Sequence, residues 1–429
     1  MKKQVKVLWF DPQYRASAPE LARAIKDFAK HLSKFEISKG LRRRARTDAA
    51  RRNFFTSVEA LICNLVLLSR MDDDTALAVP RAHASMWAKG RYANPIYGQH
   101  FLDAIDVMAK LGLLRKLSKG YRFSAKVAAP SLITPTERLS AYLPLNDFDL
   151  TALRRLHEPE VLILRSGRDG NEPSTSIDYR ETRERKLWRG QVQRINSWLR
   201  DADIEIADSD ERVHLGKDGN LIVIHRRSLR RIFNNGTWRH GGRLAGGFWM
   251  SMARAERFQC IRLDGERIAD VDYQQLFPRL AYVRAQAPQP EGDIYDVAGD
   301  GSGRDGWKML LNAMLFANDR LGNWPEGARE HVPEGTKLRD AIEMLRRKHA
   351  PIAHLFGTGL GFELMRIESD ILISVVSHLF RQGITALPLH DAVLVGRSHA
   401  ETAKHAMQDE FTFRTGSPCA IVSIDSAPS

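Results

Sequence analysis

Apolar and polar positions along this chain predict helices in its first third. Residues 57–71 (SVEALICNLVLLSRM) are apolar over a length typical of a buried helix. Residues 98–111 place apolar side chains three to four positions apart, which indicates a helix with one buried face. A basic helix is predicted over residues 20–52, and residues 113–125 predict two short strands around a Lys-Gly turn. Residues 130–139 (PSLITPTERL) are expected to form a linker.

The middle of the chain combines a polar loop, a basic helix and a glycine-rich segment. Residues 165–176 are rich in Gly, Ser and Asp, and residues 182–200 have the pattern of an amphipathic basic helix. Residues 229–250 (LRRIFNNGTWRHGGRLAGGFWM) interleave glycines with aromatic residues and arginines. Glycine allows close backbone approach, arginine binds phosphate and aromatic rings stack on bases. The same pattern is also that of a glycine-rich hairpin with packed aromatic side chains.

Two aspartates follow predicted strands in the C-terminal part. Residues 268–271 predict a strand, and Asp272 follows it shortly before a helix begins at residue 276. Residues 384–396 (ITALPLHDAVLVG) predict a β-hairpin whose turn is His390-Asp391 instead of the usual Asn-Gly. A carboxylate at such a turn suggests a chemical role. The structural alternatives are a helix N-cap for the first aspartate and an unusual turn for the second.

A helix predicted over residues 304–320 lies between these aspartates in the sequence. Arg304, Lys308, Asn312 and Phe316 recur every four residues along it and trace one slowly drifting stripe. Phosphoryl transfer with two metal ions needs carboxylates that hold the ions about 3.5–4 Å apart. It also needs cations that bind the phosphates. Two separated aspartates and a cationic helix are the residue types that this chemistry uses.

The net charge of +13 is concentrated near the N-terminus. Residues 1–130 contain 25 Lys and Arg against 11 Asp and Glu, whereas the rest of the chain contains 40 against 41. Such concentration is typical of a nucleic-acid-binding module, and a basic face that only keeps the protein soluble is the alternative. Helices followed by a basic hairpin predict a winged helix-turn-helix, a motif that also docks proteins. The hairpin displays Arg115, Lys116, Lys119 and Arg122.

Composition argues against several other classes. No apolar run approaches the roughly 18 residues that a membrane span needs, and the apolar stretch at the N-terminus is too short for a secretory signal. The cysteines Cys63, Cys260 and Cys419 lie far apart, so the sequence offers neither a disulfide framework nor a Cys-x-x-Cys metal site. We therefore expect a cytoplasmic protein that does not bind membranes.

Three motifs in a fixed order resemble the polymerase core of family A DNA polymerases, the class of bacterial DNA polymerase I. DVDYQQLFPR (270–279) resembles their motif A, in which Asp, Tyr, Gln and Arg match. RDGWKMLLNAMLF (304–316) resembles motif B, and LPLHDAVLV (387–395) resembles motif C. Two further segments are similar to family features, namely EGDIYDVAG (291–299) and the helix before motif C, FELMRIESDIL (362–372). The resemblance covers about residues 262–396.

This resemblance implies a two-metal catalytic site. Asp272 and Asp391 would hold two Mg²⁺ ions, for which Mn²⁺ can substitute. One ion would activate a primer 3′-hydroxyl, and the other would hold the triphosphate and neutralise the leaving pyrophosphate. Arg304 and Lys308 would bind the triphosphate, and Lys308 would protonate pyrophosphate as a third catalytic residue. His390 would lie near the primer-terminal phosphate.

Two larger sets of candidate residues complete this interpretation. The expected nucleotide-binding residues are Gln275, Phe277, Arg304, Lys308, Asn312 and Phe316. The expected nucleic-acid-binding residues are Arg115, Lys116, Lys119, Arg122, Arg231, Arg239, Arg243 and His390.

Four positions depart from the family pattern. Phe277 replaces the glutamate that excludes ribose 2′-hydroxyls, and Phe316 replaces the motif B tyrosine that pairs with it. Phe277 is either itself a steric gate under C2′ or part of a looser pocket that accepts ribonucleotides. Asn312 replaces a phenylalanine, and Ala392 removes a glutamate next to the motif C aspartate. These departures affect sugar choice and fidelity but leave the metal-binding aspartates in place.

We therefore expect an α+β protein with a right-hand polymerase core, consisting of a palm with an antiparallel sheet and short helical fingers. The expected domains are a basic winged-helix-like nucleic-acid-binding domain (1–140), a thumb-like connecting region (141–261) and a palm and fingers core (262–429). The expected activity is that of a DNA polymerase without proofreading, similar to short family A-like polymerases of prophages and mobile elements. DNA template, primer or nascent strand and nucleoside triphosphates would be its partners.

Three alternatives remain open from the sequence. The same palm suits a primase or a DNA-dependent RNA polymerase, which differ in sugar choice and primer dependence. A non-catalytic DNA-binding replication or regulatory factor is the alternative from another class, although such a protein would tend to lose one of the two aspartates. Untemplated addition to 3′ ends is the third alternative.

Overall fold

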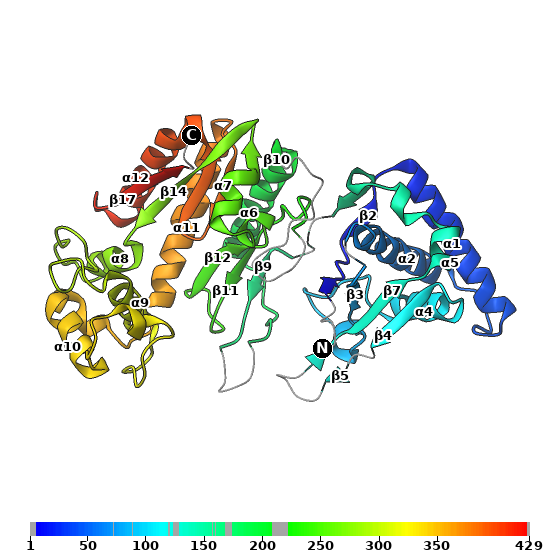
Figure 1. Ribbon diagram of the computed structural model, residues 1–429, viewed down its shortest axis with the longest axis horizontal. Helices are drawn as coiled ribbons and strands as arrows, with labels where there is room; N and C mark the ends of the chain where they lie inside the picture. Colours follow the sequence, from blue (N-terminus) through cyan, green and yellow to red (C-terminus); the bar gives the residue numbers. More distant parts are fainter. Residues whose placement is uncertain are drawn as a thin grey trace.

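The chain folds into a mixed α+β structure with two lobes, seen in a computed structural model (Figure 1). The structure describes residues 6–71, 73–87, 89–118, 121–122, 128–156, 158, 160–167, 174–207 and 222–426. For residues 83, 84, 121, 122, 128 and 129 it describes the backbone alone. Among the described helices, none is long and apolar enough to cross a membrane.

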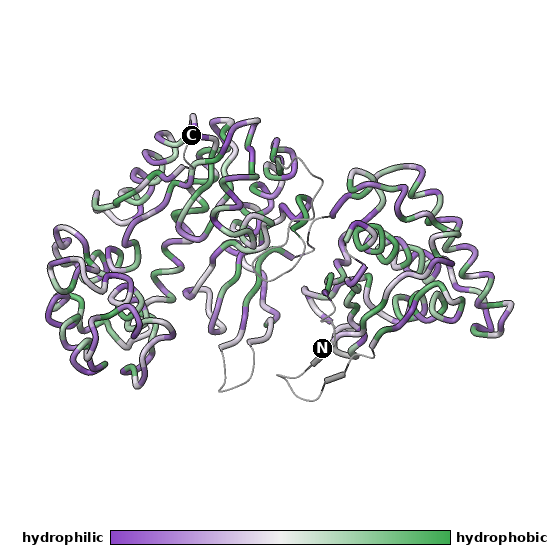
Figure 2. Tube along the Cα trace, in the orientation of Figure 1, coloured by the Kyte–Doolittle hydropathy of each residue, from purple (hydrophilic) through white to green (hydrophobic). Residues whose placement is uncertain are grey.

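The N-terminal lobe packs helices against a four-stranded sheet. Its long helices are α1 (Pro19–Ser38), α2 (Asp48–Leu68) and α4 (Gln99–Lys110). In spatial order its strands are β1 (Lys6–Trp9), β3 (Thr75–Val79), β7 (Ser131–Pro135) and β4 (Leu114–Ser118). β1 and β3 are parallel, and the other neighbours are antiparallel. Helix α2 is apolar on almost every side, because it forms the centre of this lobe's hydrophobic core (Figure 2).

Shorter elements complete the N-terminal lobe. They are β2 (Tyr14–Ala16) paired with β8 (Leu153–Arg155), β5 (Tyr121–Arg122) paired with β6 (Ala128–Ala129), α3 (His83–Met86), α5 (Glu137–Tyr142), η1 (Leu145–Asp147) and η2 (Leu150–Ala152). The predicted domain boundary at residue 140 therefore falls inside α5. Strand β8, beyond that boundary, still pairs with the N-terminal lobe.

The structure corrects three sequence-based predictions in this lobe. The two strands of the basic hairpin predicted over residues 113–125 pair elsewhere, β4 with β7 and β5 with β6. The single helix predicted over residues 20–52 is two helices, because Gly40 has a φ of 66° and the side chain of Thr47 begins α2 by accepting the backbone N–H of Ala50 at 3.4 Å. The predicted linker over residues 130–139 is wrong. Its apolar residues form β7, which lies between β3 and β4, so this short stretch is part of the sheet.

The larger lobe is built on a six-stranded antiparallel sheet. Its strands are β10 (Ile204–Ile206), β13 (Ile261–Leu263), β14 (Glu266–Gln274), β16 (Ala392–Gly396), β15 (Ala386–Leu389) and β17 (Ile421–Ser426), which pairs with β14. Two long helices, α11 (Gly361–Arg381) and α12 (Ala400–Thr415), pack on this sheet, and a third, α6 (Arg183–Asp201), packs on α11. Tyr273 of β14 donates its hydroxyl to the backbone carbonyl of Met407 in α12 at 2.5 Å, which anchors the helix to the central strand.

A second, three-stranded sheet supports the other side of α11. It consists of β12 (Gly241–Ala245), β11 (Arg230–Phe233) and β9 (Leu162–Leu164). Gly242 has a φ of 85°, and its carbonyl accepts a hydrogen bond from the hydroxyl of Ser369 in α11, so the backbone of β12 lies close to α11. Short elements follow this sheet: η3 (Phe248–Met250) and α7 (Arg254–Cys260). The predicted glycine-rich segment is therefore a hairpin with packed aromatic rings.

A small helical part projects from the larger lobe, at the lower left of Figure 1. Its elements are α8 (Leu276–Arg284), α9 (Arg304–Phe316), η4 (Ala328–His331), α10 (Leu338–Lys348) and η5 (Ala350–Leu355). It has its own hydrophobic cluster around Trp307, Leu310 and Leu345. The helix predicted over residues 304–320 ends at Phe316, because Ala317 takes an extended conformation.

The two lobes meet through buried ion pairs. Arg91 of the N-terminal lobe binds Glu160 at 2.9 Å, and Glu160 in turn binds Arg189 of α6 at 3.1 Å. Arg226 lies 3.7 Å from Asp11. Glu160 is buried and accepts hydrogen bonds from an arginine of each lobe, so it links the two lobes. Replacing this glutamate would leave both arginines without a buried partner carboxylate.

Candidate functional site

The pairing of two strands brings the predicted aspartates together. Asp272 near the end of β14 lies directly opposite Ala392, the first residue of β16. Asp391 precedes Ala392, and its backbone carbonyl accepts the N–H of Tyr273 at 3.3 Å. Residues that are far apart in the sequence thus become neighbours at one end of the central sheet.

The turn between β15 and β16 explains why Asn-Gly is absent there. Strand β15 ends at Leu389 and β16 begins at Ala392, so His390 and Asp391 alone form the turn. His390 has a φ of 59°, the sign that the first position of a type II′ turn requires. Histidine adopts this left-handed region more readily than most non-glycine residues. His390 therefore adopts the positive φ that this turn requires. The second turn position does not need a positive φ, so it can be an aspartate.

Asp391 disfavours the charged form of Asp272. Burial and the nearby carboxylates of Asp391 and Asp270 together raise the pKa of Asp272 to about 8, although Lys308 and Arg254 act in the opposite direction. Burial also raises the pKa of Asp270, whose Oδ1 atom has no hydrogen-bond partner. The described cations therefore do not fully compensate the negative charge at the end of β14.

The donor chemistry of this pair fits a hard divalent cation. Carboxylate oxygens are the ligands that Mg²⁺ prefers, and Mg²⁺ commonly binds through one or two carboxylates and completes its shell with water and substrate phosphates. Among the described residues, no group of three or more His, Cys, Asp or Glu side chains is placed to hold a metal ion. Asp272 and Asp391 are thus the residues that would hold Mg²⁺, with oxygen ligands from elsewhere.

Helix α9 contributes the cations that face this end of the sheet. Arg304 forms an ion pair with Asp293, and its guanidinium carbon lies 5.4 Å from the centre of the Tyr295 ring. Lys308 places its Nζ atom 6.0 Å from the same ring and is close enough to Asp272 to lower that residue's pKa. Asn312 lies close enough to the Tyr295 hydroxyl to lower its pKa. Arg304, Lys308 and Asn312 of the predicted stripe therefore all lie near Tyr295, whereas Phe316 packs against other rings.

Gln275 stands at the start of α8 and joins these elements. It adopts a left-handed conformation with a φ of 61°, and its amide nitrogen donates to Asp293 at 3.0 Å. Its side-chain oxygen accepts from Arg279 at 3.0 Å. The matched Gln and Arg of the first motif thus brace the Asp293–Arg304 pair, which positions the N-terminal end of α9.

Phe277 and Phe316 form an aromatic pair. Their ring centres lie 5.3 Å apart in an edge-to-face arrangement, and Phe316 packs in the same way on Phe362 at 5.2 Å. Gly361 precedes Phe362, and an added Cβ there would come within 2.5 Å of the Phe316 ring. The Phe277 ring is therefore supported by a packed stack.

An ion pair next to this stack was missed by the sequence analysis. Arg243 donates two hydrogen bonds to Glu368 of α11, at 2.8 and 2.7 Å, and its guanidinium carbon lies 5.4 Å from the centre of the Phe277 ring. Glu368 is buried, and burial raises its pKa to about 7, with Asp391 acting in the same direction. Glu368 is followed directly by Ser369 and Asp370, so no local sequence pattern marked it as buried.

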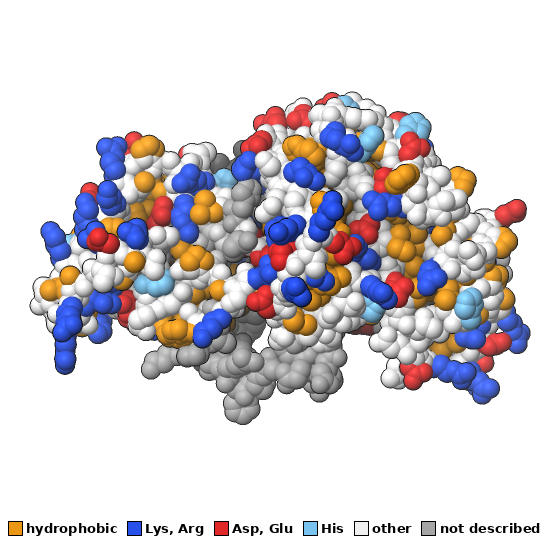
Figure 3. Space-filling model, turned by 180° about the vertical axis from the view of Figure 1, so that it is seen from behind, with side chains coloured by type: hydrophobic (Ala, Val, Ile, Leu, Met, Phe, Trp, Pro, Cys, Tyr) orange, Lys and Arg blue, Asp and Glu red, His pale blue; other side chains and the backbone are white. Residues whose placement is uncertain are grey.

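The remaining predicted nucleic-acid contacts fall into different environments. Arg231 is 1% exposed and binds Asp370 at 2.5 Å, so it is a buried structural residue and its predicted contact with nucleic acid is corrected. Arg239 and Arg115 are exposed, and Lys116 binds Asp106 at 2.8 Å. Lys119 and the side chain of Arg122 lie outside the described residues. Figure 3 shows many Lys and Arg side chains along the N-terminal lobe.

A cavity of about 520 Å³ connects His390 with the N-terminal lobe. Its lining includes Trp9 of β1, Arg226 and the backbone of Gly246 and Gly247. Trp9 is 53% exposed, which is unusual for so large an apolar ring. The cavity thus begins beside the acidic turn and ends at an accessible aromatic surface of the other lobe.

No family model matches the chain, and no curated protein matches it. The function has to be inferred from the side chains and their arrangement.

The carboxylate pair predicts a stability that depends on pH and on metal. Because the pKa of Asp272 is raised in the folded state, the folded protein loses stability as pH rises from about 4 to 8. In EDTA, Asp272→Asn should raise Tm by several degrees at pH 8 and change it little at pH 5. Mg²⁺ should raise the Tm of the unmodified protein at pH 8 but not that of Asp272→Asn.

Scanning calorimetry at both pH values measures this effect. Asp409→Asn, which changes an exposed aspartate of α12, is the matched control and should behave like the unmodified protein. Equal stabilisation of both aspartate variants by Mg²⁺ would show that the ion binds elsewhere.

Proposed function

We propose that the protein is a template-directed nucleotidyltransferase that uses two divalent cations, most simply a DNA polymerase without proofreading. The observation that carries the proposal is the antiparallel register of β14 and β16, which places Asp272 beside Asp391 and close to Lys308 of α9. Neighbouring carboxylates and a nearby cationic helix are the residue types that two-metal phosphoryl transfer from a triphosphate uses.

Each side chain has a role in this proposal. When bound, the two Mg²⁺ ions would supply a lowered pKa for the attacking 3′-hydroxyl and charge neutralisation for the triphosphate and pyrophosphate. Asp272 and Asp391 would hold the ions. Lys308, exposed on α9, would bind the triphosphate and donate a proton to the leaving pyrophosphate. Arg304, held by Asp293, would bind the outer phosphates.

The polymerase architecture follows as part of the same proposal. The six-stranded sheet with α11 and α12 would be the palm, and α8 to α10 would be short fingers. The duplex would lie between the lobes, where the cavity beside His390 reaches Trp9. The basic N-terminal lobe, proposed to act as a winged-helix-like module, would bind the phosphate backbone through exposed cations such as Arg115.

Primer extension tests the proposal directly. The unmodified protein should extend a primed template with dNTPs and Mg²⁺. Asp272→Asn and Asp391→Asn should each lower the rate at least about 100-fold, since each removes a metal ligand. Lys308→Ala should lower it roughly 10²- to 10⁴-fold, the range of general acid catalysis. Asp409→Asn is the control and should retain the full rate.

The nucleotide and template requirements separate the related activities. Product only from NTPs on unprimed template would identify a primase, and product that ignores template sequence would identify untemplated addition. No incorporation under any condition, with DNA binding unchanged in both aspartate variants, would contradict an enzymatic role and favour a DNA-binding factor.

The aromatic stack predicts the sugar preference. Because Phe316 and Phe362 fix the Phe277 ring, this ring would exclude a ribose 2′-hydroxyl by contact. Phe277→Val should therefore raise ribonucleotide incorporation relative to deoxynucleotide incorporation by at least tenfold, as single-nucleotide kinetics would measure. Phe258→Leu, which removes a ring outside the stack, should leave the ratio unchanged. An unmodified protein that already uses both sugars equally would indicate the looser pocket.

A further inference from the structure

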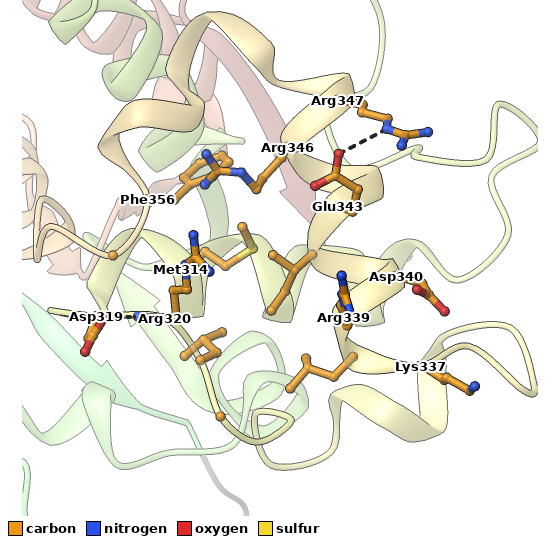
Figure 4. Close-up of a pocket in the computed structure, with 15 residues that line it drawn as sticks. Met314, Asp319, Arg320, Lys337, Arg339, Asp340, Glu343, Arg346, Arg347 and Phe356 are labelled. Atoms are coloured by element: carbon orange, nitrogen blue, oxygen red, sulfur yellow. Dashed lines mark hydrogen bonds and ion pairs between the residues drawn. The ribbon is translucent and has the colours of Figure 1, made fainter.

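A cavity of about 1040 Å³ lies in the small helical part, away from the aspartates (Figure 4). It is enclosed by the end of α9, the loop after it, helix α10 and residues 356–357. Met314, which lines it, follows Lys308 by six residues and so lies roughly 120° away around α9. The cavity is therefore separated from the proposed triphosphate site by the body of one helix.

Backbone hydrogen bonds join the end of α9 to residues 357–359 at one wall of this cavity. The N–H of Gly357 donates to the carbonyl of Met314 at 2.9 Å, and the N–H of Gly359 donates to the carbonyl of Ala317 at 2.7 Å. Gly357 has a φ of 77°, and an added Cβ would come within 3.2 Å of the backbone of Asp319. The shape of the cavity is therefore set by backbone contacts and does not depend on side-chain positions alone.

The lining combines an apolar floor with a cationic rim. The apolar side chains are Met314, Leu321, Leu338, Ile342 and Phe356. Figure 4 places Arg320 and Arg339 on opposite sides of these side chains. Both arginines are exposed, and the contacts among the described residues give neither side chain an ion pair. A third arginine, Arg346, lies beside Phe356 and donates to the carbonyl of Ala353 at 3.2 Å.

The carboxylates of the lining leave this positive charge largely uncompensated. Glu343 pairs with Arg347 at 3.1 Å, on the outer side of α10 in Figure 4. Asp319 accepts the backbone N–H of Arg320 at 2.7 Å, and Asp340 points away from the apolar side chains. A ligand in the cavity would therefore meet arginine guanidinium groups above a hydrophobic surface.

We propose that this cavity is a second, non-catalytic binding site for a nucleotide unit, with the base on the apolar floor and the phosphate between Arg320 and Arg339. Arginine binds phosphate through paired N–H donors, and a base stacks on an aromatic or apolar surface. The volume lies at the upper end of the roughly 300–1,000 Å³ of small-ligand sites, so a nucleotide fits with room for a neighbour. The unit can belong to a free nucleotide or to a single strand.

Arginine footprinting on the full chain tests this site without requiring catalysis. The protein in EDTA would be treated with phenylglyoxal, alone or with a 12-residue oligothymidylate, ATP or polyglutamate, and modification at each arginine measured by mass spectrometry. Oligothymidylate or ATP should slow modification of Arg320 and Arg339 at least fivefold and leave Arg329, an exposed arginine outside the cavity, unchanged. Protection by the strand alone identifies a single-stranded ligand, and protection by ATP identifies a free nucleotide.

Two charge-matched double variants complete the test. Arg320→Ala combined with Arg339→Ala should abolish protection of Arg346, whereas Arg284→Ala combined with Arg329→Ala should retain protection of all three cavity arginines. Protection by neither nucleotide probe, or equal protection by polyglutamate, would overturn the proposal. Because the footprint needs neither metal nor turnover, failure of primer extension would leave it intact, and the reverse also holds.

Discussion

The register between β14 and the β15–β16 hairpin is the constraint on which the candidate site depends. It sets Asp272 opposite Ala392, and a slip of one residue would turn Asp272 to the other face of the sheet. Contacts from several elements hold this register. The buried indole of Trp249 donates to the carbonyl of Pro388 at 2.8 Å, and Tyr273 binds the backbone of α12. These contacts thus stabilise the pairing of β14 with the hairpin, although that pairing brings two carboxylates close together.

Holding the carboxylates of Asp272 and Asp391 together without full compensation by cations costs the folded protein electrostatic free energy. Buried charges are usually paired within the protein, as in the Arg243–Glu368 and Arg231–Asp370 contacts of this lobe. Asp272 and Asp391 differ because Lys308 of α9 and Arg254 only partly offset the unfavourable effect of Asp391 and of burial on the Asp272 charge. A cation supplied from solution would complete the balance, and this is why we propose that the site is functional.

The sequence predicted those elements whose pattern is local. The helix expected over residues 98–111 is α4, and the hairpin with its His390-Asp391 turn is β15 and β16. The strand expected over residues 268–271 is longer, because β14 continues to Gln274, and Asp272 therefore lies within it and does not follow it. Long-range pairing was not predictable. Arg243 meets Glu368 only because β12 packs on α11, and Arg231 is buried by the same contact. The five residues of β7 resembled a linker because they form a strand only through pairing with β3 and β4, which are distant in the sequence or not recognisable as its partners.

The most direct measurement of the central claim is electron paramagnetic resonance with Mn²⁺ in place of Mg²⁺, on the full chain with primed template and a non-hydrolysable dNTP analogue. Two Mn²⁺ ions should bind per chain, with the spin coupling of ions about 3.5–4 Å apart. Asp391→Asn should abolish the coupled signal, and Asp409→Asn should preserve it. Absence of coupled ions in the unmodified protein, or a coupled signal that survives Asp391→Asn, would contradict the account.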